Sequence, residues 1–145
     1  MKVKIKKLNE NAKMPTYGSP YSAGADLYAC IDEEITIAPG ETVLVKTGLA
    51  MELDLGYVAL IYARSGLATK KGLAPANKVG VVDCDYRGEI MVALHNHSTV
   101  PQTVSKDERI AQMVIAPYIL AEFEEADTLS ETLRGDGGFG STGSK

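Results

Sequence analysis

The sequence predicts an all-β fold: a jelly-roll-like antiparallel β barrel or sandwich with one short helix and a flexible, glycine-rich C-terminal arm. Three observations predict it. Short runs in which every second residue is apolar recur along the chain and are bounded by turn residues. Only one stretch has a helical pattern, which argues against alternating strand and helix units. Glycine is concentrated near the C-terminal end.

The alternation of apolar residues predicts about nine short strands. The dipeptide Pro39-Gly40 predicts a hairpin turn, and residues 119–125 are a further candidate for an edge strand. The predicted strands are residues 2–8, 25–30, 34–38, 41–46, 57–62, 79–83, 89–95, 102–104 and 109–116.

Residues 65–71 carry the helical pattern. Ser65 can act as the N-cap, because its hydroxyl can accept a hydrogen bond from a backbone N–H of the first turn. Gly72 is suited to end the helix, because it tolerates the left-handed conformation that closes many helices. We therefore predict a helix of about two turns.

Length and composition indicate one soluble domain. The chain has 145 residues, of which 45% are hydrophobic, and we expect a β domain over 1–125 followed by a linker and arm over 126–145. Its apolar runs are too short to span a membrane, and we expect a cytoplasmic protein with no membrane partner. The net charge of -4 argues against a long nucleic-acid footprint but is compatible with a small polyanion.

Cys30 and Cys84 stand alone in the sequence, without the paired spacing of a metal or redox motif. The chain has only two histidines, His95 and His97, so no array of zinc ligands is present. We expect both cysteines to be reduced core residues.

Five of the ten residues in 134–143 are glycine, and an Arg, a Phe and two hydroxyl residues lie among them. One interpretation is a disordered terminus, because such ends are common. The other is an arm that orders on a ligand: Arg134, Ser141 and Thr142 suit phosphate oxygens, and Phe139 offers a face for a base.

Arg64-Ser65-Gly66 ends a predicted strand and opens the predicted helix. Backbone N–H groups at a helix start, with a guanidinium and a hydroxyl beside them, suit a phosphate. The same three residues also fit an ordinary helix cap with a surface arginine.

Residues 80–91 predict a hairpin in which two apolar strands are joined by a polar turn. Asp83 stands at the end of the first strand, on the same face as Val79 and Val81. It is a candidate general base, and the alternative is that Asp83 and Asp85 only shape the turn.

Five motifs in this order resemble the homotrimeric deoxyuridine triphosphatases (dUTPases, dUTP pyrophosphatases): residues 23–29, 64–66, the hairpin around Asp83, 108–112 and the glycine-rich tail. The resemblance spans residues 23–143. It implies a jelly-roll homotrimer with three interfacial sites that hydrolyses dUTP to dUMP and pyrophosphate with Mg²⁺. Such an enzyme limits uracil incorporation into DNA and supplies dUMP for thymidylate synthesis.

The resemblance also implies the role of each site residue. Asp83 matches the carboxylate that activates the attacking water, Tyr86 the ring under the deoxyribose, and Asp26 the acid that reaches the metal indirectly, through water. In the tail, Arg134 matches a γ-phosphate ligand, Phe139 the ring that covers uracil, and Ser141 and Thr142 the hydroxyls that close over the phosphates. The remaining matches are Asn77, Val81, Val82 and Met91 for the uracil pocket, and Arg64, Ser65, Gly66 and Gln112 for the phosphate clamp.

Elementary chemistry is compatible with this assignment. Uracil presents an acceptor, a donor and an acceptor along its pairing edge, which the fixed backbone of a hairpin can complement. Cytosine reverses two of these groups, and each buried unpaired group costs about 1–3 kcal/mol. Phosphoryl transfer mainly needs positioning and charge neutralisation, which arginines, a metal and one base can supply.

Asp107 departs from the family pattern, which usually has glycine two residues before the arginine of the fourth motif. We expect only a local effect on the turn and on nearby charge. Three rival functions remain: a related deoxycytidine triphosphate deaminase, a module that binds dUTP without hydrolysing it, and a purely structural jelly-roll trimer. The Asp83 hairpin argues against the first, and Asp83 together with the tail argues against the second. The third would not need the tail.

Overall fold

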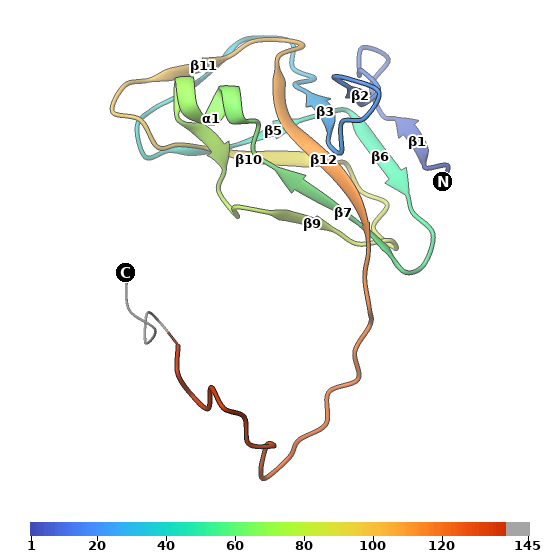
Figure 1. Cartoon of the computed structure of the whole chain (residues 1–145). Helices are drawn as coiled ribbons and strands as arrows, with labels where there is room; N and C mark the ends of the chain where they lie inside the picture. The colour runs from blue at the N-terminus through green and yellow to red at the C-terminus, as the bar shows by residue number, and fades with distance from the viewer. Residues whose placement is uncertain (139–145) are drawn as a thin grey trace.

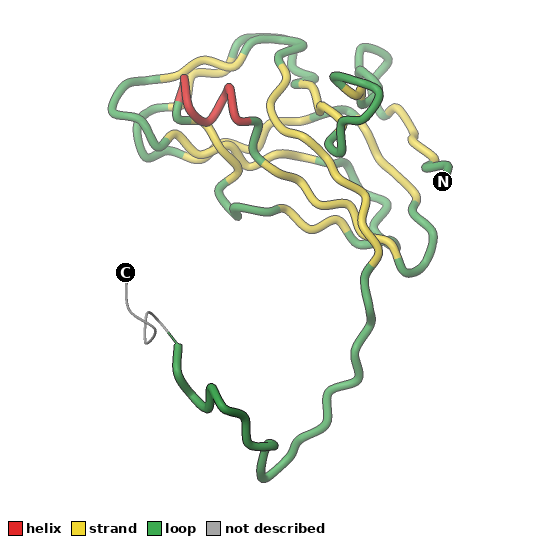
Figure 2. The backbone as a smooth tube through the Cα atoms, viewed as in Figure 1, coloured by secondary structure: helices red, strands yellow, loops and turns green. Residues whose placement is uncertain are grey.

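The computed structural model describes residues 1–138, which form twelve β-strands and one short α-helix (Figures 1 and 2). The chain order is β1 (Lys4–Lys7), β2 (Thr16–Tyr17), β3 (Ala25–Tyr28), β4 (Ile35–Ile37), β5 (Thr42–Lys46), β6 (Leu49–Glu52), β7 (Tyr57–Tyr62), α1 (Ser65–Lys71), β8 (Leu73–Pro75), β9 (Gly80–Val82), β10 (Met91–Asn96), β11 (Gln102–Val104) and β12 (Arg109–Pro117).

The strands pair into four antiparallel sheets. The largest has the order β2-β3-β12-β7-β9, the next is β5-β10-β8, and the pairs β1-β6 and β11-β4 complete the set. The all-β, antiparallel prediction with one short helix is therefore confirmed. The described strands do not close into a barrel ladder, so the barrel form of the prediction is not found.

Side chains from all four sheets meet in one hydrophobic core. Leu27, Ile37 and Leu94 have no exposed surface, and each lies on a strand of a different sheet. Asn96 is fully buried among them, and its amide nitrogen donates to the Ile37 and Val100 carbonyls. Its amide oxygen accepts from Ser98. All four bonds are internal, which offsets the cost of burying the amide.

All nine predicted strands are present, with ends that shift by one or a few residues. Three strands were missed, β2, β6 and β8. The first has only two residues, the sequence of β6 is an apolar run without alternation, and β8 ends in Pro75. None of them shows the period of two on which the prediction depends.

The two predicted hairpins are wrong. A turn does form at Pro39-Gly40, where the Glu41 N–H donates to the Ala38 carbonyl and Gly40 has φ of 75°. However, β4 then pairs with β11, while β5 pairs with β10. Likewise β9 pairs with β7, and β10 pairs with β5 and β8. In both cases strands adjacent in sequence separate into different sheets, which local alternation cannot reveal.

The helix has the predicted bounds, but Ser65 is not its N-cap. Arg64 occupies the cap position in an extended conformation, and no side chain caps the first turn. The guanidinium of Arg64 is instead held by Asp26, and Ser65 is the first helical residue. Gly72 closes the helix with φ of 68°, as predicted. This helix is too short and too polar to cross a membrane, and no other helix is described.

The predicted edge strand at residues 119–125 is wrong. After β12 ends at Pro117, the described chain has no further strand and runs away from the sheets (Figure 1). Ile119, Leu120 and Phe123 are 92%, 89% and 95% exposed. None of the residues that the structure describes covers these apolar side chains or offers a strand to pair with them. We call residues 118–138 the described arm.

Candidate functional site

The first of two pockets of interest lies where the start of α1 meets the beginning of β12 and the segment before β3. We call it the arginine pocket. It is an open cavity of about 370 Å³. It is lined by Gly18, Ser22, Ala23, Gly24, Asp26, Arg64, Ser65, Gly66, Arg109 and Gln112.

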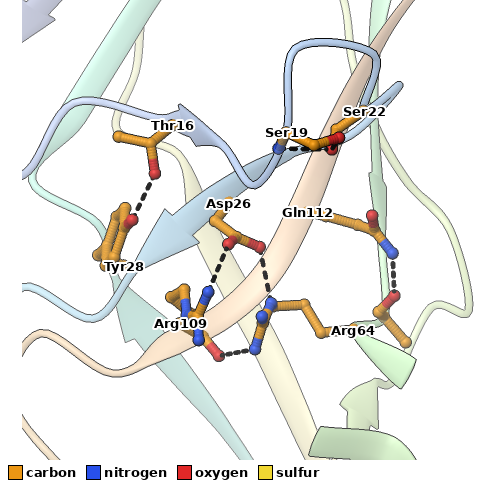
Figure 3. Close-up of polar contacts among 9 residues, drawn as sticks. Thr16, Ser19, Ser22, Asp26, Tyr28, Arg64, Arg109 and Gln112 are labelled. Atoms are coloured by element: carbon orange, nitrogen blue, oxygen red, sulfur yellow. Dashed lines mark hydrogen bonds and ion pairs between the residues drawn. The ribbon is translucent and has the colours of Figure 1, made fainter. Parts of the chain in front are cut away.

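Asp26 is the centre of the arginine pocket (Figure 3). Its carboxylate is buried and accepts hydrogen bonds from two guanidinium groups, Arg64 Nε at 2.6 Å and an Arg109 terminal nitrogen at 3.2 Å. One carboxylate thus orients two arginines that enter from β12 and from the residue before α1. Two guanidiniums against one carboxylate leave the cluster with one excess positive charge, which suits an anion.

Gln112 lies on β12 and reaches the same pocket. Its amide nitrogen donates to the Ala63 carbonyl at 2.8 Å. A Cβ atom on Gly24 would collide with the Gln112 side chain. Gly24, in the predicted motif at 23–29, therefore leaves the space that the Gln112 side chain occupies.

Three further hydrogen bonds fix the walls of the arginine pocket. Lys71, in the last turn of α1, donates to the Glu108 carboxylate at 2.7 Å and to the Thr103 carbonyl at 2.9 Å. Because Glu108 directly precedes Arg109, this ion pair joins the helix to the strand that carries the second arginine. In the loop before β3, the Ser22 hydroxyl accepts from the Ser19 N–H at 3.0 Å.

Asp107 does not line the arginine pocket. It adopts the left-handed conformation that glycine favours, with φ of 64°, and its carboxylate pairs with Lys13 Nζ at 3.1 Å. The Lys13 ammonium also lies 5.5 Å from the centre of the Tyr28 ring. The extra negative charge of this position is therefore balanced by Lys13 outside the pocket.

The second pocket lies between β9 and β10, and we call it the strand pocket. It is an open cavity of about 280 Å³. Its lining includes Ile61, Asn77, Val81, Val82, Asp83, Tyr86 and Met91. No hydrogen bond joins β9 to β10 in the described part of the chain, so the absent hairpin ladder leaves a slot with backbone on both sides.

Asn77 and Gly80 shape one wall of the strand pocket. A Cβ atom on Gly80 would lie 3.4 Å from the Asn77 amide nitrogen and 3.1 Å from Ile61. The absence of a side chain at Gly80 thus lets the Asn77 amide and Ile61 approach the β9 backbone.

Tyr86 folds back over the loop that follows Asp83. Its hydroxyl donates to the Glu89 carbonyl at 3.0 Å, and a Cβ atom on Gly88 would collide with the Tyr86 ring. Gly88 is therefore required for this ring position. Asp83 is exposed at the end of β9, where its carboxylate is accessible to a ligand in the pocket.

The two pockets share no lining residue, and Asp83 and Arg64 lie level with opposite ends of β7. Val82 pairs with Ala59, which places Asp83 level with Val58, while Arg64 follows the other end of the strand. Six extended residues span about 20 Å. Asp83 and Arg64 of one chain are therefore well separated.

Of the predicted tail residues, only Arg134 lies in the described part. Its Nε donates to the Gly137 carbonyl at 2.7 Å, in a local turn that contributes to neither pocket. Phe139, Ser141 and Thr142 lie outside the described residues.

The structure thus gathers Asp26, Arg64, Ser65, Gly66 and Gln112 in one pocket and the predicted base-side residues in the other. Sequence reasoning missed Arg109 as a site residue, although it stands in the fourth motif and every other arginine of the chain also lies in a short polar motif. It also missed Ser22 and two glycines, Gly24 and Gly88, which leave room for the side chains of Gln112 and Tyr86.

Comparison with known proteins decides the family. The dUTPase family model matches residues 10–143, which is nearly the whole chain. The chain belongs to the dUTPase family. It is 53% identical to the deoxyuridine 5'-triphosphate nucleotidohydrolase of Desulfitobacterium hafniense strain DCB-2, over 99% of this chain and 97% of that protein. It is 52% identical to the protein of the same name from Hydrogenobaculum sp. strain Y04AAS1, over the full length of both.

The fold agrees with this dUTPase assignment. The dUTPase of Staphylococcus bacteriophage 80alpha, solved with dUpNHpp, superposes with a TM-score of 0.86 at 28% identity, covering 98% of each chain. A second phage enzyme, a mutant dUTPase from phage phi11 of S. aureus, superposes with a TM-score of 0.81 at 22% identity, over 90% of this chain and 100% of that one.

Proposed function

We propose that this protein hydrolyses dUTP to dUMP and pyrophosphate in a homotrimer whose sites combine residues of different subunits. The observation that carries the proposal is the strand pocket, a backbone-lined slot that ends at the exposed carboxylate of Asp83 and at Tyr86. In the cytoplasm this activity would keep uracil out of DNA and supply dUMP for thymidylate synthesis.

The strand pocket suits uracil. Its volume of about 280 Å³ is at the low end for small-molecule sites, which fits a base and a sugar better than a whole nucleotide. Because β9 and β10 do not pair with each other, their facing peptide groups can bond the donor and acceptor edge of uracil. Asn77 lies beside these groups, and the side chains along the slot are Val81, Val82 and Met91. Cytosine would leave buried groups unpaired, so the pocket would reject it.

In this proposal Asp83 takes a proton from a water molecule, whose oxygen forms a bond to the α-phosphorus. The bond from that phosphorus to the bridging oxygen breaks, and pyrophosphate leaves with the electron pair. The exposed position of Asp83 gives it access to this water. Tyr86, held over Gly88, lies beneath the deoxyribose and leaves no space for a 2′-hydroxyl.

The arginine pocket is proposed to hold the phosphates. Arg64 is pre-oriented by Asp26, and Ser65, Gly66 and Gln112 surround the same space. This arrangement supplies charge and hydrogen-bond donors that need no rearrangement when charge develops in the transition state. We assign Arg109 to the same set.

Mg²⁺ fits this donor set as an ion that arrives with the triphosphate. The described residues contain no cluster of three or more acidic, His or Cys side chains, and both oxygens of Asp26 already bond arginines. Mg²⁺ commonly keeps several waters and binds substrate phosphates with few protein ligands, so Asp26 would reach it through water. When bound, the ion neutralises charge on the phosphates.

Two features support sites shared between subunits. Asp83 and Arg64 of one chain lie about 20 Å apart along β7, too far to act on the same phosphate. In addition, the described arm carries apolar side chains that residues 1–138 of the chain leave exposed. A cyclic trimer would bring the strand pocket of one subunit to the arginine pocket of the next, and arms with Arg134, Phe139, Ser141 and Thr142 would close the sites.

The direct test is pyrophosphate release from dUTP, dTTP, dCTP and UTP with and without Mg²⁺. We expect rapid release from dUTP alone, dependent on the metal. In Asp83→Asn, turnover should fall at least about 100-fold while dUTP still binds, because the amide keeps the shape but cannot accept the proton. Wild-type turnover in this variant would reduce Asp83 to a turn residue, and equal use of all four nucleotides would overturn the substrate assignment.

Complementation tests the shared site. One inactive protein carries Asp83→Asn, and the other carries Arg64→Ala. If both residues act within one chain, every site in a co-refolded mixture lacks one of them and activity stays at background. If they act across an interface, random assembly from equal amounts restores about a quarter of the sites. The matched control is wild type mixed with a chain that carries both substitutions.

A parallel mixture tests the arm. It combines Asp83→Asn with a chain that ends after Leu133, which lacks Arg134 and the remaining tail residues. Recovery toward a quarter of the sites is again expected. Background activity in mixed trimers confirmed by native mass spectrometry would show that arm and base act in the same chain.

A further inference from the structure

Tyr118 is the last residue that hydrogen bonds to the body of strands within the described chain. Its N–H donates to the Gly56 carbonyl at 2.9 Å, in the turn between β6 and β7. Beyond it, the hydrogen bonds of the described arm are all local, within residues 132–137. Because Pro117 fixes the preceding backbone, Tyr118 sets the point and direction from which the arm departs.

The side chain of Tyr118 reaches the loop that carries Asp83. Its hydroxyl lies 3.6 Å from the Cys84 sulfur. Cys84 is only 8% exposed, packs in the hydrophobic core and stands between Asp83 and Asp85. Its carbonyl also accepts a hydrogen bond from Arg87 at 2.7 Å. Cys84 therefore fixes the loop to the core, and the Tyr118 hydroxyl contacts Cys84 from the start of the arm.

We propose that Tyr118 is a positioning residue that links the start of the C-terminal arm to the loop bearing Asp83. This inference rests on the proposed role of Asp83 as the base. In the proposed trimer, the arm of a subunit closes a site that uses the Asp83 of another subunit. Tyr118 therefore connects the arm that closes one site to the Asp83 that acts in a different site. Neither Tyr118 nor Cys84 lines the strand pocket or the arginine pocket, so they act through the residues they hold.

The titration of Tyr118 agrees with this contact. The hydrogen bond with Cys84 raises the pKa of the Tyr118 hydroxyl, and the charge of Cys84, burial and the nearby Asp83 and Asp85 add to the rise. The phenol therefore remains protonated at neutral pH and available as a donor to sulfur.

The first experiment is a double-mutant cycle on dUTP hydrolysis. Tyr118→Phe and Cys84→Ala should each lower kcat by about three- to tenfold with little change in KM, and the double variant should be no worse than either single one. Cys84→Ser should retain near wild-type kcat, because a hydroxyl can replace the sulfur as the partner. The matched control is Tyr57→Phe, whose hydroxyl makes no hydrogen bond in the described chain and which we expect to be silent. Additive effects, wild-type kcat in both single variants or failure of Cys84→Ser to rescue would overturn the proposal.

The second experiment does not depend on activity. NMR of ¹³C-tyrosine follows the titration of Tyr118, with its signal assigned by its loss in Tyr118→Phe. Cys84→Ala should lower the Tyr118 pKa toward its ordinary value, and an unchanged pKa would overturn the contact. If the wild type released no pyrophosphate from dUTP, the proposed function would fail, and this titration would still test the link between Tyr118 and Cys84.

Discussion

The arginine pocket is formed mainly by charged side chains, whereas the strand pocket is formed mainly by backbone and apolar side chains. The arginine pocket depends on charged side chains that brace one another, with Asp26 between two guanidiniums and Lys71 on Glu108 behind them. The strand pocket depends on backbone and apolar side chains, and its shape comes from two strands that do not pair.

This difference determines how each pocket responds to amino-acid substitutions. The buried Asp26 carboxylate joins two partly exposed arginines, so the removal of this one charge leaves both guanidiniums uncompensated. A slot made of backbone cannot lose its hydrogen-bonding groups by substitution, and it changes only when a side chain moves its walls. Substitutions in the arginine pocket should therefore affect stability as well as chemistry. In the strand pocket, substitutions other than those of Asp83 should mainly affect selectivity.

The largest effect on stability is expected for Asp26→Asn. The amide can bond one arginine but cannot balance two, so two guanidiniums would face each other in a part-buried pocket. We expect the free energy of unfolding to fall by about 1–3 kcal/mol, measured by urea denaturation at fixed protein concentration. The matched control, Asp54→Asn at an exposed position in the loop between β6 and β7, should change stability little. Equal effects of the two variants would mean that the charges of the arginine pocket are not coupled.

The strand pocket should respond differently to Tyr86→Ala. Removal of the ring opens space beneath the sugar, so the ratio of dUTP to UTP hydrolysis should drop, chiefly through better use of UTP. Gly88→Ala is a second route to the same result, because the new Cβ displaces the ring without removing it. Both variants should keep near wild-type stability. An unchanged ratio in both would place sugar discrimination elsewhere.

Much of this architecture could be predicted from the sequence because it is local. Alternation located nine strands, and short motifs identified five of the ten residues that line the arginine pocket and six of the fourteen that line the strand pocket. What the sequence did not reveal depends on long-range pairing. The strand pocket exists because β9 leaves β10 and pairs with β7, and the arginine pocket is completed by Arg109, whose role depends on an aspartate 83 positions earlier. The segment at 119–125 has the composition of a strand but has no pairing partner among residues 1–138.

The smallest effect is expected just outside the arginine pocket, at Asp107. Asp107→Gly relieves the left-handed backbone but loses the Lys13 ion pair, whose side chains are 48% and 36% exposed. An exposed pair contributes about 0–1 kcal/mol, and the strain is of similar size, so the two should nearly cancel. Asp107→Ala loses the ion pair and keeps the strain, so it should be less stable than Asp107→Gly by about 1 kcal/mol in urea denaturation. KM for dUTP should be unchanged in both variants. A marked change in KM would mean that the charge of Asp107 acts on the bound phosphates and is not balanced by Lys13.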